Sequence, residues 1–341
     1  MDSKLLRREK LLPFLDRLRE GFLLVAPVEE DALLFYRPVE SVAEIRLNPG
    51  RSVVPPKEWF FPQAESLYRY NTESGRLVLE ETLAAAPAVL FGIHPCDLRS
   101  FAVLDAVFLQ EPVDRYYALR RERTVIIGIS CSAVCPECFC TAYGISPVEG
   151  TGADIHLSEV GAVYMVEVLT RRGKELVARC QEFFEDNVAG VAEAKEARKE
   201  TLSGQFTVQV TVDGLPARLG HLFDHPYWEE LSRRCLGCGI CTYVCPTCHC
   251  FDITDVCRGF EGKRFRCWDA CLFRDYTLHT SGHNPRHALY QRLRNRFFHK
   301  LKYNHDRYAI EGCVGCGRCV ALCPVNIDIR EVIATVRGLG E

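Results

Sequence analysis

The sequence lacks the features of a membrane or nucleic-acid protein. No apolar run reaches the length that crosses a bilayer. The opening MDSKLLRREKLLPFLDRLRE is typical of a charged amphipathic helix and has no apolar signal-peptide core. The 42 basic and 45 acidic residues give a net charge of −3, which offers no general attraction to nucleic acid or anionic lipid. We therefore expect a cytoplasmic protein without membrane insertion and without a nucleic-acid partner.

The usual signatures of catalysis are also missing. No G-x-G-x-x-G follows a predicted strand, and neither a Walker loop nor a nucleophile elbow is present. His94 and Asp97 could form an acid–base pair, but we expect Asp97 to cap the following helix and His94 to lie in a turn. The sequence thus predicts no catalytic residue and no flavin in this chain. A self-contained flavin reductase and an iron–sulfur nucleic-acid protein are disfavoured alternatives.

Cysteine, in contrast, is abundant, with 19 residues in a chain of 341. The odd number and the expected reducing compartment disfavour a disulfide framework. A chain of this length, with 48% hydrophobic residues, can build the cores of two domains without disulfide bonds. Clustered cysteines in this setting indicate metal binding.

Six cysteines fall within the sixteen residues CLGCGICTYVCPTCHC, Cys235 to Cys250. The end of this segment matches the C-x-x-C-H of covalent haem attachment, which requires export, so we expect no haem and treat His249 as a loop residue. Structural zinc sites usually divide their ligands into two separated pairs. The spacing C-x2-C-x2-C-x3-C-P is instead that of a bacterial ferredoxin, in which the fourth cysteine ligates a second cluster.

That pattern requires a second run, and CVGCGRCVALCP, Cys313 to Pro324, supplies it. The glycines within both runs allow the backbone to bend close to the sulfurs. The exchange of fourth ligands then defines two [4Fe–4S] clusters. We expect the first to bind Cys235, Cys238, Cys241 and Cys323, and the second to bind Cys313, Cys316, Cys319 and Cys245.

More cysteines follow two predicted strands, AVLFGI (88–93) and TVIIGI (124–129). Both are continuously apolar, as in a parallel sheet that is covered on both faces. Parallel neighbours would bring Cys96 and Cys131 to the same carboxyl edge, where open α/β sheets bind ligands. We expect a third cluster there on Cys96, Cys131, Cys138 and Cys140, with Cys135 competing for one position.

A short internal sequence repeat suggests one more cluster site. VCPECFC (134–140) matches VCPTCHC (244–250) at five of seven positions. The thiols left over in the second copy lie near WDAC in the sequence. The sequence leaves open whether a fourth cluster forms there or the thiols pack in the core; its ligands would be Cys248, Cys250, Cys267 and Cys271. Cys180, in KELVARCQEFF, is expected to be an ordinary core thiol.

These patterns predict an α+β fold. We expect a hairpin around ADIHLSEVGAVYMVEVL, an exposed helix at AEAKEARKE and one helix at GHLFDHPYWEELSRR. We expect a mixed α/β domain over residues 1–220, with the cysteine cluster at its sheet edge, and a ferredoxin-like dicluster domain over 221–341 with a helical insertion at 251–312. The insertion has apolar residues at helical spacing. Its basic residues predict either a solvated face or a docking face for an acidic protein partner: Arg286, Arg292, Arg294, Arg296, Lys300 and Lys302.

Several segments, spread over nearly the whole chain, carry a resemblance to one family: LFGIHPCDLRSFAVLD, ECFCTAYG, RCLGCGICTYVCPTCHC, WDAC, SGHNPR and CVGCGRCVALCP. In these segments the chain is similar to the beta subunit of soluble NAD(P)-linked nickel–iron hydrogenases of the sulfhydrogenase type, a family that also includes the A subunit of anaerobic sulfite reductase. Cys135 departs from the family pattern, and the ending CPVNIDI is more similar to the hydrogenase branch.

The resemblance implies an electron-transfer subunit rather than a catalytic one. Such a subunit relays electrons through [4Fe–4S] clusters that connect the small and large subunits of a nickel–iron hydrogenase with a flavin-containing, NAD(P)H-reactive subunit. The alternative that it implies is the A subunit of a sulfite reductase, which passes electrons toward a sirohaem subunit.

Overall fold

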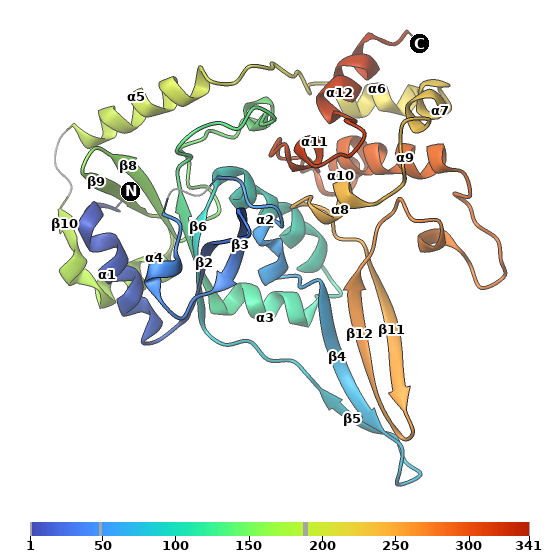
Figure 1. Ribbon diagram of the computed structural model, residues 1–341, viewed down its shortest axis with the longest axis horizontal. Coiled ribbons are helices and arrows are strands. Elements are labelled where there is room, and N and C mark those ends of the chain that lie inside the picture. The colour runs from blue at the N-terminus through green and yellow to red at the C-terminus, as the bar shows by residue number, and fades with distance from the viewer. Residues whose placement is uncertain (1, 48–49, 187–189, 341) are drawn as a thin grey trace.

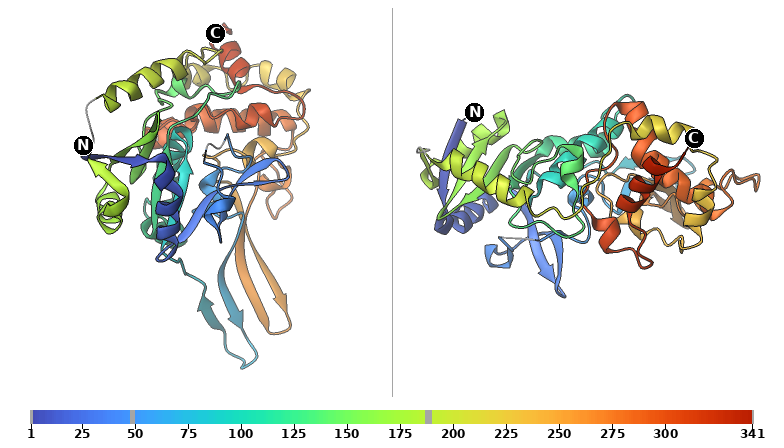
Figure 2. Two further views of the ribbon diagram at one scale, coloured as in Figure 1. Left: turned by 60° about the vertical axis from the view of Figure 1, so that its left-hand side comes forward. Right: turned by 90° about the horizontal axis from the view of Figure 1, so that it is seen from above.

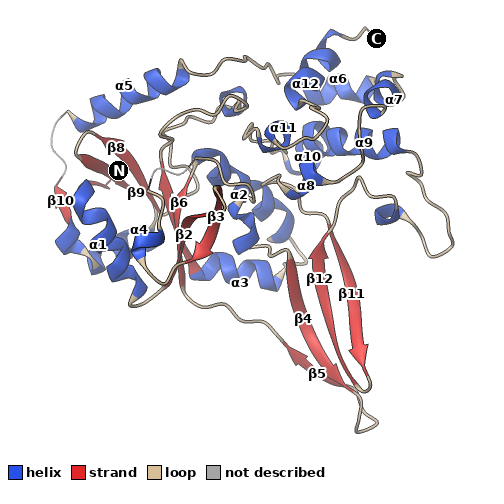
Figure 3. Ribbon diagram, in the orientation of Figure 1, coloured by secondary structure: helices blue, strands red, loops and turns tan. Residues whose placement is uncertain are grey.

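The computed structural model describes residues 2–47, 50–186 and 190–340. It combines an eight-stranded mixed sheet, a four-stranded antiparallel sheet and a layer of helices (Figures 1 and 3). The strands are β1 (Asp2–Arg7), β2 (Leu23–Glu30), β3 (Leu33–Pro38), β4 (Ala64–Asn71), β5 (Val78–Glu81), β6 (Ala88–Ile93), β7 (Thr124–Ile129), β8 (Ile155–Val160), β9 (Val163–Val168), β10 (Phe184–Asp186), β11 (Phe251–Arg258) and β12 (Glu261–Trp268).

The helices flank the large sheet and build the C-terminal third of the chain. Within the described residues, none combines the length and the apolarity that a bilayer crossing requires. They are α1 (Arg8–Arg19), α2 (Pro95–Phe108), α3 (Arg115–Arg123), α4 (Arg171–Arg179), α5 (Val191–Ser203), α6 (Leu215–His221), α7 (Tyr227–Ser232), α8 (Ile240–Tyr243), α9 (Leu289–Phe298), α10 (Asn304–Tyr308), α11 (Arg318–Ala321) and α12 (Ile329–Gly338).

The large sheet has the strand order β10-β1-β9-β8-β7-β6-β2-β3. The predicted strands β6 and β7 are confirmed as parallel neighbours, with Ala88 opposite Thr124. Their alternate side chains enter two cores, because successive residues of a strand point to opposite faces. One core is closed by α1 and α4, and the other by α2 and α3. Cys180 is 4% exposed in the first core, as expected.

Two helices differ from the sequence prediction. The first six described residues form β1 rather than helix, because they pair with β9 on one side and β10 on the other. The segment GHLFDHPYWEELSRR forms α6 and α7 instead of one helix. The break falls before Pro226, whose nitrogen carries no hydrogen and cannot continue a helix. The predicted hairpin of β8 and β9 and the exposed helix α5 are confirmed.

The insertion at 251–312 is not only helical. It begins with the hairpin β11–β12. Strand β12 pairs with β4 from the other half of the chain, and β4 pairs in turn with β5. These four strands form an arm that projects away from the helices (Figures 1 and 2). Trp268 anchors the base of the arm, since its indole N–H donates to the Phe61 carbonyl oxygen at 3.0 Å. The helical part follows as α9 and α10.

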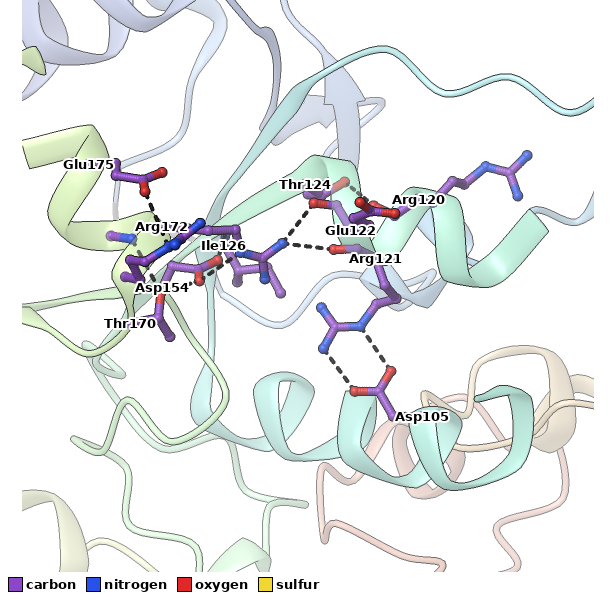
Figure 4. Close-up of polar contacts among 12 residues, drawn as sticks. Asp105, Arg120, Arg121, Glu122, Thr124, Ile126, Asp154, Thr170, Arg172 and Glu175 are labelled. Carbon is purple, nitrogen blue, oxygen red and sulfur yellow. Dashed lines mark hydrogen bonds and ion pairs between the residues drawn. The ribbon is translucent and has the colours of Figure 1, made fainter. Parts of the chain in front are cut away.

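A polar network fixes the edge of the large sheet where α3 ends and α4 begins (Figure 4). The carboxylate of Asp154, 2% exposed, accepts hydrogen bonds from the Ile126 backbone N–H at 2.8 Å and from Thr170 and Arg172. Arg172 also donates to the Arg121 and Glu122 carbonyl oxygens, which end α3. A cation at a helix C-terminus satisfies carbonyls that lack partners in the helix.

One buried ion pair joins the two halves of the chain. The Arg318 guanidinium donates to both carboxylate oxygens of Asp97 at 2.7 Å, and both side chains are 1% exposed. Arg318 also donates to the carbonyl and hydroxyl oxygens of Ser52. The expectation that Asp97 caps α2 is wrong, because this helix starts after His94 without a side-chain cap and the carboxylate faces the guanidinium.

We predict that Asp97→Asn lowers the free energy of unfolding by about 3–5 kcal/mol, because it leaves a buried guanidinium without its counter-charge. The control is Asp255→Asn in the pair Asp255–Arg264, which has similar two-pronged geometry but side chains that are 40% and 42% exposed. This control should cost less than about 1 kcal/mol. Anaerobic denaturant unfolding measures both, and equal losses would contradict the role of the buried pair.

Candidate metal centres

The first predicted ligand set lines one pocket together. The walls between the thiols are mostly apolar, and they include Leu236, Leu272 and Phe297. Two backbone N–H groups donate to the sulfurs: Gly237 to Cys235 at 3.3 Å and Ile327 to Cys323 at 3.2 Å. Hydrogen bonds of this kind stabilise thiolate ligands. The thiols of this pocket, called here site 1, are Cys235, Cys238, Cys241 and Cys323.

The second predicted set lines a neighbouring pocket. The backbone N–H of Gly315 donates to the sulfur of Cys313 at 3.5 Å. The two short helices within the runs, α8 and α11, each begin after a glycine with positive φ, Gly239 at +77° and Gly317 at +72°. This repeated geometry carries each fourth cysteine to the opposite pocket. The thiols of this pocket, called site 2, are Cys245, Cys313, Cys316 and Cys319.

The donor sets of both sites fit iron–sulfur clusters. Four thiols around an apolar cavity, with N–H groups directed at sulfur, are the ligands that a [4Fe–4S] cluster requires. In the described part of the chain, no three Cys, His, Asp or Glu side chains lie close enough to hold a single metal ion. Burial raises the pKa of Cys319 to about 12 and of Cys313 to about 11. Thiolates at these positions therefore depend on nearby positive charge.

In addition to the iron of a bound cluster, the basic helix of the insertion supplies positive charge here. Arg292, Arg296 and Lys300 recur at a spacing of four residues and are 9%, 3% and 5% exposed. The prediction of a solvated or docking face is wrong for these three, because their side chains are buried. Arg296 lines both sites and donates to the Cys241 carbonyl oxygen at 3.3 Å. Burial opposes the charge of Arg296, but the thiols of Cys241 and Cys319 hold its pKa well above the usual value.

The loop 131–140 of the N-terminal part docks directly on site 2. The Phe139 backbone N–H donates to the Gly315 carbonyl oxygen at 2.8 Å. The Arg51 guanidinium donates to the Cys316 carbonyl oxygen at 2.9 Å. A Cβ on Gly317 would lie 2.5 Å from the Glu137 carbonyl oxygen, so only glycine permits this approach of two backbones.

Five thiols gather at this contact, called site 3, which lies at the carboxyl edge of β6 and β7. Cys140 packs with Cys316 and Cys96 in one small buried cluster. Burial, reinforced by the neighbouring thiol of Cys140, raises the pKa of Cys131 to about 12. The Cys138 thiol lowers the pKa of Cys135 by a hydrogen bond, and Arg51 adds to the shift. Any four of these five thiols could bind one cluster. The five are Cys96, Cys131, Cys135, Cys138 and Cys140.

Three of the four thiols predicted for the remaining site, called site 4, also lie together. The Cys271 thiol hydrogen-bonds to Cys250 and lowers its pKa, and Cys248 lies within electrostatic reach of both. Cys267 does not join them. On β12 the side chains of Arg266 and Trp268 are 3% and 7% exposed, so alternation turns Cys267 to the opposite face, near Asp252 and Asp269.

Sequence reasoning missed several polar residues around site 4. The Lys57 ammonium donates to the Cys248 carbonyl oxygen at 2.7 Å and lies 4.1 Å from the Trp268 ring centroid. Burial lowers the pKa of Lys57 to about 8. The Tyr276 hydroxyl forms a hydrogen bond with Cys250. Lys57 lies in a short segment without periodicity, so no pattern identified it. His249 lies in the loop before β11, as expected, and is partly buried beside Phe108 and His299.

Comparisons with known proteins bear on the same segments. Residues 234–327 match the family model of the 4Fe-4S dicluster domain, which spans sites 1 and 2. The chain is 32% identical over 335 residues to the sulfhydrogenase 2 subunit beta of Pyrococcus furiosus, and the alignment covers 97% of each chain.

We predict that Gly315→Ala weakens the contact between sites 2 and 3. An added Cβ would lie 2.5 Å from the backbone of Phe139, at a φ of +61°. The control Gly75→Ala has a φ of +71° and open space, so it should cost only about 1–2 kcal/mol for the left-handed backbone. Denaturant unfolding should give a larger loss for Gly315→Ala, and losses of equal size would contradict the close approach of the loops.

Proposed function

Because this chain belongs to the family of sulfhydrogenase beta subunits and carries a 4Fe–4S dicluster domain, we propose that it relays electrons within a multi-subunit nickel–iron hydrogenase. Its [4Fe–4S] clusters connect the small and large hydrogenase subunits with a flavin-containing, NAD(P)H-reactive subunit. The chain itself binds neither flavin nor haem and carries no catalytic residue. The observation that carries the proposal is the pair of four-cysteine pockets, each completed by the fourth cysteine of the other run.

The ligands of the two clusters of the dicluster domain are the thiols of sites 1 and 2. A third cluster is held at site 3, on Cys96, Cys131, Cys138 and Cys140 or with Cys135 in one place. For site 4 we propose a [4Fe–4S] cluster with three cysteine ligands, Cys248, Cys250 and Cys271, and a ligand other than cysteine at its fourth iron, without Cys267. This revision is supported by the alternation along β12. Thiolate-ligated clusters of this kind serve one-electron transfer.

The contacts among the sites support a branched path. Cys319 lines both site 1 and site 2. Site 3 touches site 2 through Cys140 and Cys316. Site 4 adjoins it through a hydrogen bond between the thiols of Cys248 and Cys245. Site 2 is therefore the junction, and site 1, whose ligand Cys238 is exposed, is an exit to the surface.

The alternative function is that of the A subunit of an anaerobic sulfite reductase, with electrons passed toward a sirohaem subunit. The relative named for a sulfhydrogenase beta subunit favours the hydrogenase assignment, because its alignment with this chain is nearly complete. The electron-transfer path through the clusters of this chain is the same in both functions. The two differ only in the protein that accepts the electrons.

Iron and acid-labile sulfide analysis tests the clusters. We expect about sixteen irons per chain, because four cubanes carry four irons each. Cys271→Ser should lose about four irons, whereas Cys267→Ser should keep the full content, because its side chain faces away from site 4. Cys257→Ser, at an exposed position, is the control. A content of about eight irons in the wild type would reject sites 3 and 4. A loss in Cys267→Ser would reject the revised ligand set.

Anaerobic affinity purification from the native host tests the partners. We expect a flavoprotein and a nickel-containing large subunit to co-purify, together with hydrogen-dependent reduction of NAD(P). Co-purification of a sirohaem subunit would assign the chain to sulfite reduction instead. Recovery of the chain alone, without a flavoprotein or a catalytic partner, would contradict the relay function.

A further inference from the structure

Lys300 is the one lysine whose ammonium directly donates to a thiol of sites 1 and 2, among the hydrogen bonds of the described residues. It donates to the sulfur of Cys245 at 3.0 Å, to the Gly312 carbonyl oxygen at 3.0 Å and to the Thr247 hydroxyl. These three bonds use all three of its protons. The side chain is only 5% exposed, so water does not screen its charge.

The backbone directs Lys300 inward. The residue lies in a π-helical turn, His299–Tyr303, inserted between α9 and α10. Such wide turns are rare and often occur at functional sites. All three partners of the Lys300 nitrogen accept hydrogen bonds, which suits an ammonium that donates three protons and carries its charge into the interior.

Sites 1 and 2 differ in this respect. The hydrogen bonds that the described residues make to the site 1 sulfurs come from the backbone N–H groups of Gly237 and Ile327. Site 2 has a comparable backbone bond, from Gly315 to Cys313, and the Lys300 ammonium in addition. Arg296 lines both sites, so its charge does not separate them. Arg318 also lies near a site 2 thiol, that of Cys316, but the Asp97 carboxylate neutralises its charge. Lys300 is the cation that bonds directly to a ligand sulfur, and this bond distinguishes the two environments.

We propose that Lys300 is a positioning residue that raises the reduction potential of the site 2 cluster above that of the site 1 cluster. The inference rests on the proposed function. A cluster gains one electron and no atom on reduction, so its negative charge increases. A fixed positive charge and a hydrogen bond at a ligand sulfur stabilise the reduced form more than the oxidised form. Electrons then occupy the site 2 cluster in preference to the site 1 cluster, and site 2 is the junction that connects sites 1, 3 and 4.

A redox titration of the intact complex, followed by electron paramagnetic resonance, tests this role. In Lys300→Met, the midpoint potential of one cluster should become more negative, far enough to reverse the order in which the site 1 and site 2 clusters are reduced. The control, Lys302→Met, removes the same charge from the outer side of the helix, where Lys302 pairs with Asp306. It should leave every potential in place.

Two further variants keep the test decisive. Lys300→Arg preserves the charge and should retain most of the wild-type potential, whereas Lys300→Gln keeps a donor without charge and should shift it partway. If Lys300→Met loses iron, the potential measured in Lys300→Gln decides the question. Unchanged potentials in iron-replete Lys300 variants would overturn the inference alone. A wild-type complex whose chain binds no iron would overturn the proposed function as well.

Discussion

Thiolates bring negative charge into an interior that tolerates charge only when it is compensated. The fold supplies the compensation from three buried cations, Arg296, Lys300 and Arg318, which are 3%, 5% and 1% exposed. Two of them belong to the helical segment between the ferredoxin runs, and the third lies within the second run. The insertion thus has an electrostatic role beyond spacing, because it places Arg296 and Lys300 against the thiols of sites 1 and 2.

The need to compensate buried charge also links the two halves of the chain. Arg318 lies beside Cys316 of site 2 and is neutralised by Asp97, next to Cys96 of site 3. Charge balance at one site is therefore completed by a residue of the other. The two halves also bond to each other directly at this contact, because the backbone N–H of Phe139 donates to the carbonyl oxygen of Gly315. The sites form one electrostatic unit although their ligands come from distant segments.

The predictions that the structure confirmed rest on patterns within short segments of the sequence. Strands β6 and β7 are continuously apolar and were found at the expected residues. The spacing of cysteines and glycines was enough to propose sites 1 and 2. The sequence could not show the Asp97–Arg318 pair, whose partners are 221 residues apart. It also missed the arm, because β5 and most of β11 are exposed and lack a clear alternation of buried side chains. The orientation of Cys267 depends on the arm strand β12, so it was missed as well.

The arm constrains how the protein can be made. β4 and β5 are synthesised early, but the hairpin that pairs with β4 appears only at residues 251–268. Until then β4 has an open edge with unpaired N–H and carbonyl groups, which is a template for association with other chains. A fragment that stops at residue 220 would keep this edge permanently. Translation must therefore pass residue 268 before β4 can pair with β12 of its own chain.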